Sequence, residues 1–176
     1  LVIGSPLAGR ERGESERMIG VFLNLLPMRI DLSGNPTFRE LLRRARQTAL
    51  DAYDHQEVSF EGLVAVLGLK REPTHNPIFQ CTLNMLNFPA MGGELPGGVD
   101  VEPIRMGDVG CKYDFTLYGT DTPEGLHFNI LYAVNLLDCP KMEALQDQVR
   151  EVLELAVEHP DTPIGQFPAA APDVVA

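Results

Sequence analysis

Apolar residues recur three or four positions apart in two long stretches of the chain, which is the spacing of an amphipathic helix. The first stretch predicts a helix ending near residues 53–55, with Asn35 as its cap and Pro36 at its first position. A shorter helix is predicted after the capping residue Ser59, and Gly68 is placed to end it in a left-handed conformation.

The second long stretch predicts a last helix, capped by Asp138 or Cys139, with Pro140 near its start.

Elsewhere apolar and polar residues alternate with a period of two, which indicates strands. Alternation over residues 113–130, broken by a turn at 121–125, predicts an antiparallel hairpin. Further strands are predicted at Leu1–Ile3, Val21–Ile30, 79–85 and Val99–Met106, with a loop over 89–98.

These elements predict an α/β fold, of the α+β sandwich kind, in which helices flank a mostly antiparallel or mixed sheet. Residues 1–160 are expected to form one folded unit. Residues 161–176 are rich in Pro and Ala and are expected to form a tail or linker.

Composition narrows the class of protein. The chain has 176 residues, 44% of them hydrophobic and 22% charged, which fits one globular domain and excludes a disordered tail. No apolar run approaches the roughly 18 residues that a membrane span needs, and residues 1–20 do not show the basic-then-apolar pattern of a signal peptide, so we expect a cytoplasmic protein without membrane contact.

The net charge of −11 argues against binding to nucleic acid. Residues 1–50 differ from the rest because they hold eight arginines and five acidic residues, a net +3. Arg39, Arg43 and Arg46 share one face of the predicted first helix, and this face is either solvated or a docking surface for an acidic partner.

The residues alone do not supply a self-contained active site. The three cysteines are far apart in sequence, which predicts reduced thiols, and no two of the four histidines have metal-ligand spacing. Neither a Gly-rich phosphate loop nor a Gly-x-Ser-x-Gly elbow is present in the sequence.

Three segments are similar to signature motifs of one family, the condensation domains of nonribosomal peptide synthetases. Residues 19–29 resemble Ile-Gly-x-Phe-Val-Asn-Thr-Leu-x-x-Arg, and residues 55–61 resemble His-Gln-Asp-x-Pro-Phe-Glu. Residues 71–80 resemble Arg-Asp-x-Ser-Arg-Asn-Pro-Leu-Phe-Gln. The three motifs occur in the family's order and spacing, and the flanking residues agree. The departures are Leu25 for Thr, Glu57 and Glu72 for Asp, Ser59 for Pro, and His75 for Arg.

The resemblance implies a fold of two lobes, each like chloramphenicol acetyltransferase, with a groove between them. Two carrier proteins deliver substrates on phosphopantetheine arms, and a His-His-x-x-x-Asp-Gly motif supplies the catalytic histidine. That motif is absent from this sequence, so no catalytic residue is assigned here. The chain resembles the last two-fifths of such a domain, most of its C-terminal lobe, and is expected to be inactive alone. No directly bound cofactor or metal is expected.

The resemblance also suggests residue roles. Candidates for the groove wall or the contact between lobes are Asn24, Arg29, His55, Gln56, Phe60 and Glu61. Structural roles are expected for Arg71, Asn76 and Pro77, and Arg39, Arg43 and Arg46 are candidates for carrier docking. The implied partners are the upstream N-terminal lobe, donor and acceptor peptidyl carrier proteins, and an adjacent adenylation domain.

Besides an amide-forming condensation domain, two other functions remain open at this point. The first is a module that only docks carrier proteins. The second is a heterocyclising or ester-forming relative, because the residues that separate these activities lie in the upstream lobe.

Overall fold

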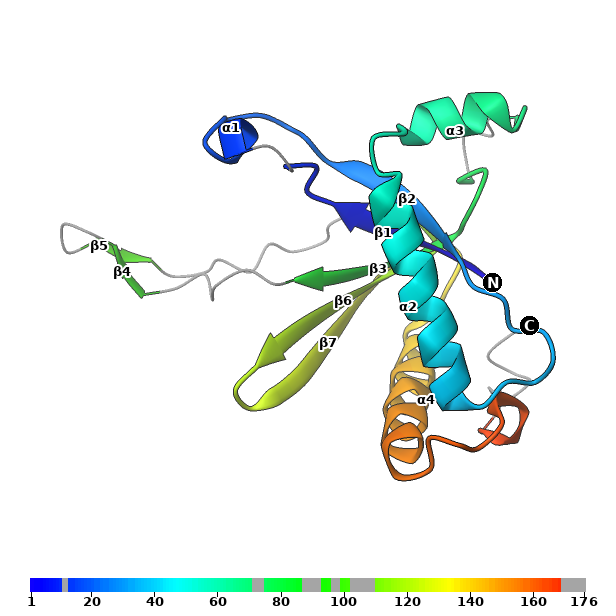
Figure 1. The fold of residues 1–176 in the computed structure, drawn as a ribbon. Coiled ribbons are helices and arrows are strands. Elements are labelled where there is room, and N and C mark those ends of the chain that lie inside the picture. Colours follow the sequence, from blue (N-terminus) through cyan, green and yellow to red (C-terminus); the bar gives the residue numbers. More distant parts are fainter. Residues whose placement is uncertain (11–12, 71–74, 87–92, 96–98, 102–109, 169–176) are drawn as a thin grey trace.

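A computed structural model describes residues 1–10, 13–70, 75–86, 93–95, 99–101 and 110–168. Its centre is a five-stranded sheet with the order β2-β1-β3-β6-β7 (Figure 1). The strands of this sheet are β1 (Val2–Leu7), β2 (Asn24–Arg29), β3 (Cys81–Leu86), β6 (Phe115–Thr122) and β7 (Gly125–Tyr132). The short strands β4 (Gly93–Leu95) and β5 (Val99–Val101) pair antiparallel with each other in a second sheet.

The main sheet is mixed, as predicted. β1 pairs antiparallel with β2, and β6 pairs antiparallel with β7 in the predicted hairpin. The central pairs, β1 with β3 and β3 with β6, are parallel. Parallel pairs need a crossover connection. Here the connection from β2 to β3 contains two helices, α2 (Phe38–Asp54) and α3 (Phe60–Val66).

Two long helices, α2 and α4 (Cys139–Glu158), lie on the same side of the main sheet (Figure 1). Strand register separates the two sheet faces, because side chains alternate along each strand. The face toward the helices carries the buried Leu26 and Met28 of β2 and the apolar residues of β7. The opposite face carries Thr82, Thr116 and other polar residues.

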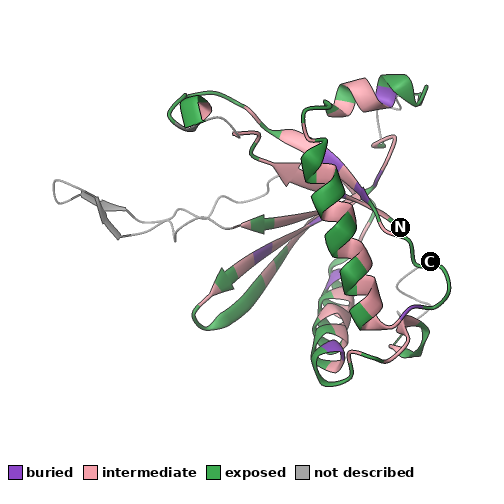
Figure 2. Ribbon diagram, in the orientation of Figure 1, coloured by how far each residue is buried: buried purple, intermediate pink, exposed green. Residues whose placement is uncertain are grey.

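The hydrophobic core is small. Among the described residues, six hydrophobic side chains are buried. In Figure 2 the positions coloured as buried are short, separate stretches of the sheet and the helices. Phe79 is the most deeply buried large side chain, with 1% of its surface exposed. It packs over Gly4, where an added Cβ would overlap the Phe79 ring, so the absence of a side chain at Gly4 is a packing requirement.

Most predicted helix ends are confirmed. Ser59 Oγ accepts a hydrogen bond from the backbone N–H of Gly62, and Gly68 adopts a positive φ of 64°. Asp138 caps α4, where its Oδ1 accepts from the backbone N–H of Lys141 at 2.9 Å. The predicted cap of the first helix is wrong, because Thr37 caps α2 and accepts from the backbone N–H of Glu40 at 3.2 Å.

Several strand boundaries differ from the prediction. The strand expected from Val21 begins at Asn24, because pairing with β1 starts with Asn24 opposite Leu7. The expected loop over 89–98 contains β4. In the range Val99–Met106, only residues 99–101 are described, and they form β5. The strand expected from residue 79 begins at Cys81, after a turn in which Asn76 Oδ1 accepts from the N–H groups of Ile78 and Phe79.

Residues 160–167 pack against the first turn of α2. The N–H groups of Phe38 and Arg39 donate to the carbonyl oxygens of Thr162 and Pro160, at 3.1 and 2.8 Å. The rings of Phe38 and Phe167 lie 6.0 Å apart. The packed structure therefore extends to Phe167, beyond the boundary expected at residue 160. Residues 169–176 of the expected linker lie outside the described part of the chain.

Asn35 takes part in this junction. It has a positive φ of 47°, and its Oδ1 accepts from the backbone N–H of Gly165 at 2.8 Å. The residue predicted to cap α2 therefore holds the end of the packed chain instead.

Candidate functional site

The side chain of Asn24 joins the first two sequence motifs. Its Nδ2 donates to the carbonyl oxygens of Gln56 and Val58, at 2.8 and 2.9 Å. Its Oδ1 accepts from the backbone N–H of Leu25 at 2.9 Å and from that of Phe60 at 3.3 Å. An Asn side chain offers two donors and one acceptor oxygen with two lone pairs, so all of this capacity is used within the chain. Asn24 is a positioning residue that holds the segment between α2 and α3.

All three motifs contribute to one concavity of about 600 Å³. It opens on the polar face of the main sheet, opposite α2 and α4. Asn24, Phe60, Glu61 and Asn76 line it, although they are far apart in the sequence. The motifs therefore have a shared spatial role that their separate positions do not show.

The floor of the concavity is formed by parallel strands β3 and β6. Thr82 and Thr116 lie opposite each other and are both buried, and the Thr82 hydroxyl donates to Thr116 Oγ1 at 2.8 Å. Asn84 and Tyr118 form the next pair along the same strands and also line the concavity. Hydroxyl and amide groups on a rigid sheet are suited to orienting a bound polar group.

An aromatic row borders this floor. The ring of Phe79 lies 5.7 Å from that of Phe60 and 5.7 Å from that of Tyr113. Tyr113 is partly buried, and desolvation is the main cause that raises the pKa of its hydroxyl, with smaller contributions from Cys111 and Tyr118. Tyr113 therefore stays a neutral hydrogen-bonding group at physiological pH.

Arg10 organises the segment before β2. Its guanidinium donates to the carbonyl oxygens of Ser15, Met18 and Gly20, the last two at 2.8 and 3.0 Å. It also lies 4.5 Å from the centre of the Phe22 ring, in cation–π contact. Arg10 is not among the candidate residues drawn from the sequence. It ends the stretch of residues 4–10, which precedes the first motif and is one of the flanking segments that agree with the family.

The other predicted wall residues are spread out. Arg29 is exposed at the far end of β2, and His55 is exposed at the end of α2, where its Nδ1 lies 2.8 Å from the Asp51 carbonyl oxygen. Neither lines the concavity. Gln56 borders a neighbouring depression together with Asn24. Among the residues expected to be structural, Asn76 makes the turn before β3, Pro77 is half-buried after it, and Arg71 lies outside the described residues.

Two of the three candidate docking arginines form ion pairs within the chain. Arg39 Nε lies 2.7 Å from Asp161, and Arg43 Nε lies 2.8 Å from Glu40. Arg44 also pairs with Glu40, at 3.0 Å, and donates to the carbonyl oxygens of Asp31 and Ser33. Hydrogen bonds from the two arginines lower the pKa of Glu40 to about 2. Arg46 is exposed on the same helix.

In the part of the chain that the structure describes, no group of three metal-ligating side chains is placed to hold an ion. Cys81, Cys111 and Cys139 are free thiols. None of the helices in the described residues has the length and apolar character required to cross a membrane.

The fold and the concavity define one lobe of an α/β domain, with helices on one sheet face and a polar hollow on the other. Residues 1–172 match the family model described as Condensation domain. The chain is 38% identical over 179 residues to a dimodular nonribosomal peptide synthase of Bacillus subtilis (strain 168), covering 97% of this chain and 7% of that protein. The chain therefore belongs to the condensation-domain family, whose relatives here are nonribosomal peptide synthetases.

Solved structures agree with this assignment. The X-domain from teicoplanin biosynthesis is 28% identical, with a TM-score of 0.84 over 96% of this chain and 39% of that one. The X-domain in complex with OxyB is 29% identical, with a TM-score of 0.82 over 96% of this chain and 37% of that one. The chain thus spans about two-fifths of these structures, and a small fraction of the synthetase.

Proposed function

We propose that this chain forms one wall of the groove in which a condensation domain joins two carrier-tethered acyl groups. The convergence of the three motifs on the polar concavity is the observation that carries the proposal. In the reaction, the amine nitrogen of the downstream aminoacyl group attacks the upstream thioester carbonyl carbon. The new C–N bond replaces the C–S bond, and the upstream phosphopantetheine thiol leaves with the surplus amine proton.

In this proposal the chain positions substrate and does not transfer the proton. Holding two tethered reactants in a productive geometry supplies much of the acceleration in reactions of this kind. Asn84 and Tyr118 present polar groups along the concavity, while Phe60 and Tyr113 supply apolar walls. A base within hydrogen-bond reach of the amine must come from another lobe, since the sequence contains no His-His pair. The partners are that lobe, two carrier proteins and an adenylation domain.

The test fills the concavity without touching the sheet's hydrogen bonds. Asn84→Phe is made in the full-length protein and assayed with a donor-loaded and an acceptor-loaded carrier, with the product identified by mass. We expect kcat/KM to fall about tenfold or more, because the floor of the groove is blocked. The matched control is Asn129→Phe, on the same sheet face but outside the concavity. Equal activity of both variants would contradict the proposal, and the product mass separates an amide from an ester or a heterocycle.

A second candidate is a docking module without catalysis. It is favoured by one solved relative, an X-domain bound to another protein, OxyB. The three candidate docking arginines, Arg39, Arg43 and Arg46, are all exposed. Among the described residues, ion pairs are found for Arg39 and Arg43 and not for Arg46. Under this reading, Arg46→Glu weakens carrier binding about threefold to tenfold at low salt, and Arg43→Glu weakens it less. Equal carrier affinity of Arg46→Glu and the unchanged protein would remove this candidate.

A further inference from the structure

The polar concavity has one apolar end. Its polar part is lined by four side chains of the parallel strands β3 and β6: Thr82, Asn84, Thr116 and Tyr118. At the end formed by β1 and β2, the lining residues are instead Pro6, Leu23 and Leu25. Pro6 and Leu25 lie opposite each other in the antiparallel pair of these strands, so they form one continuous apolar surface.

Leu25 is held in a fixed position at this end. Leu26, the next residue of β2, is buried on the helix side of the sheet, so side-chain alternation places Leu25 on the face of the concavity. The backbone N–H of Leu25 donates to Asn24 Oδ1 at 2.9 Å. Asn24 in turn donates to the carbonyl oxygens of Gln56 and Val58. The Leu25 side chain is half-buried, so part of its surface is available to a bound group.

Leu25 is also one of the departures of this chain from the first motif, which has Thr at that position. A threonine hydroxyl donates and accepts hydrogen bonds, whereas leucine offers only apolar surface. A substrate hydroxyl placed against Leu25 and Pro6 would lose its water without gaining a partner. An aliphatic group in the same place would gain free energy by leaving water. The exchange of Thr for Leu therefore changes which substrate side chain is favoured here.

Charge does not select the substrate in this concavity. Glu61 and Lys112 also line it, so its lining has one acidic and one basic residue whose formal charges cancel. The property that distinguishes the β1–β2 end from the rest of the lining is its apolar surface.

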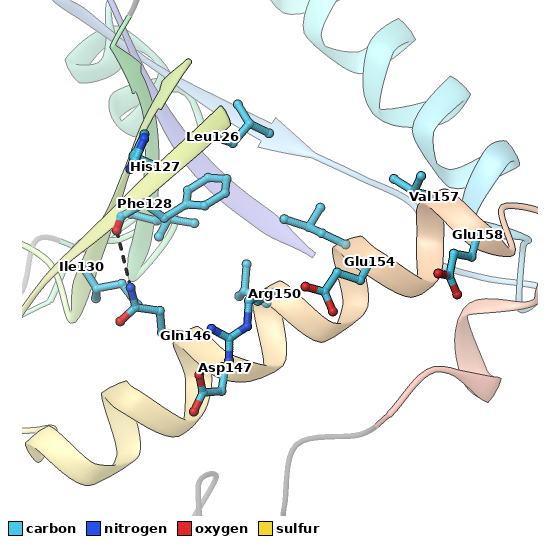
Figure 3. Close-up of a pocket in the computed structure, with 13 residues that line it drawn as sticks. Leu126, His127, Phe128, Ile130, Gln146, Asp147, Arg150, Glu154, Val157 and Glu158 are labelled. Carbon is cyan, nitrogen blue, oxygen red and sulfur yellow. Dashed lines mark hydrogen bonds and ion pairs between the residues drawn. The ribbon is translucent and has the colours of Figure 1, made fainter. Parts of the chain in front are cut away.

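A second hollow, on the other face of the sheet, is separate from the motifs. It has a volume of about 800 Å³ and lies between β7 and α4 (Figure 3). Gln146 Nε2 donates to the carbonyl oxygen of Phe128 at 3.5 Å and joins the helix to the strand there. None of the described residues that line this hollow belongs to the three motifs. A substrate side chain bound by the motifs therefore lies in the concavity and not in this hollow.

We propose that Leu25 makes the concavity selective for a carrier-tethered aminoacyl group with an aliphatic side chain, such as Val, over one of the same shape that carries a hydroxyl, such as Thr. This inference rests on the proposed function, because it names the substrate class of the same site. An apolar pocket that encloses a side chain rejects a hydroxyl-bearing isostere about 100-fold. Because Leu25 is only half-buried, we expect a smaller preference here, about tenfold.

The experiment is a competition between Val and Thr in the full-length protein. Both aminoacyl groups are loaded on the acceptor carrier as synthetic phosphopantetheine conjugates, which bypasses adenylation, and they compete for one alanyl donor. A second series places the same competition on the donor carrier, with one alanyl acceptor. The ratio of the two products, measured by mass, is the ratio of the two kcat/KM values and does not depend on the fraction of folded protein.

Leu25→Thr restores the residue of the family motif. In the unchanged protein, we expect the Val product to exceed the Thr product about tenfold in one of the two series. In Leu25→Thr, this preference should fall to about twofold or less, because a hydroxyl then meets the substrate hydroxyl. Leu25→Met keeps an apolar side chain of similar volume and should keep the preference.

The matched control is Leu86→Thr. Leu86 lies on β3, two residues after Asn84 and on the same sheet face. It is half-buried like Leu25 but does not line the concavity. We expect the ratio of Val to Thr products in this variant to equal that of the unchanged protein.

The outcomes separate this inference from the proposed function. Equal Val and Thr products in both series of the unchanged protein would overturn the inference and leave the proposed function standing, because product still forms. A preference that survives Leu25→Thr, or that Leu86→Thr lowers equally, would also overturn it. Absence of product from Val and Thr alike would refute the proposed function, and this inference with it.

Discussion

Asn24 and Val58 are joined by a hydrogen bond of 2.9 Å between residues 34 positions apart in the sequence. The bond links the start of β2 to the segment between α2 and α3. Together with the bonds to Gln56 and Phe60, it fixes the approach of α3 to the concavity. One side chain therefore sets the relative position of two sequence motifs.

Asn24→Ala tests this role directly. The substitution leaves two carbonyl oxygens and the Phe60 N–H without their partner, so we expect a loss of about 2 kcal/mol in the free energy of unfolding. Urea denaturation measures the loss. Asn129→Ala, on the exposed edge strand, is expected to stay within about 0.5 kcal/mol of the unchanged protein. Similar effects for the two variants would show that the Asn24 bonds contribute little.

Arg10→Lys should loosen the segment before β2 without unfolding the domain. A lysine ammonium is a compact charge that cannot reproduce the planar fork contacting the carbonyl oxygens of Ser15, Met18 and Gly20. We expect faster amide hydrogen exchange across residues 15–22 and unchanged exchange in α2. Arg17→Lys, an exposed arginine of the same segment, is the control. Unchanged exchange in Arg10→Lys would refute the role given to Arg10.

Glu40 should make stability depend on pH in the acid range. Its pKa is lowered from 4.5 to about 2, first by hydrogen bonds from Arg43 and Arg44. A depressed carboxyl pKa stabilises the folded state above pH 4.5, and the contribution disappears as pH falls toward 2. Glu40→Gln should therefore lower the urea midpoint at pH 7, and the difference should shrink steadily below pH 4.5. A difference that stays constant down to pH 2.5 would exclude this linkage.

Phe167→Ala tests whether residues 160–167 belong to the folded unit. Phe167 is half-buried against Phe38, so its truncation should cost about 1–2 kcal/mol. Exchange of the Phe38 and Arg39 amides should also accelerate, because both donate to this segment. Val66→Ala provides an exposed apolar control. If stability and exchange both stay unchanged, the segment behaves as a linker from residue 161, as its composition suggests.

Local signals in the sequence predicted local structure well. Ser59, Gly68 and Asp138 act within a few residues of themselves, and each has the expected role. The helix cap at Asn35 failed because a contact with Gly165, remote in sequence, engages its side chain and leaves the cap to Thr37. Capping propensity depends on the residue type and its near neighbours in the sequence, so it does not include a contact with a distant residue.

Long-range features were harder to predict. The parallel pairs of β3 depend on how distant segments meet, which period-two alternation does not encode. The motif resemblance predicted Asn24 and Phe60 as candidates for the groove wall or the lobe contact. That both line one concavity is seen only in the folded chain. Arg39 and Arg43 share a helix face as predicted, but the ion pair from Arg39 to Asp161 joins residues 122 positions apart in the sequence.

Synthesis of this chain exposes β1 long before its inner partner exists. Gly4 pairs with Thr82 of β3, a strand that ends at Leu86. Until β3 has been made, β1 and β2 form at best a two-stranded hairpin, which is marginal in water. At about 5–20 residues per second, the ribosome needs about 4–17 s to proceed from β1 to Leu86. The nascent strands must be kept from aggregating throughout that interval, and the position of β3 in the sequence sets its length.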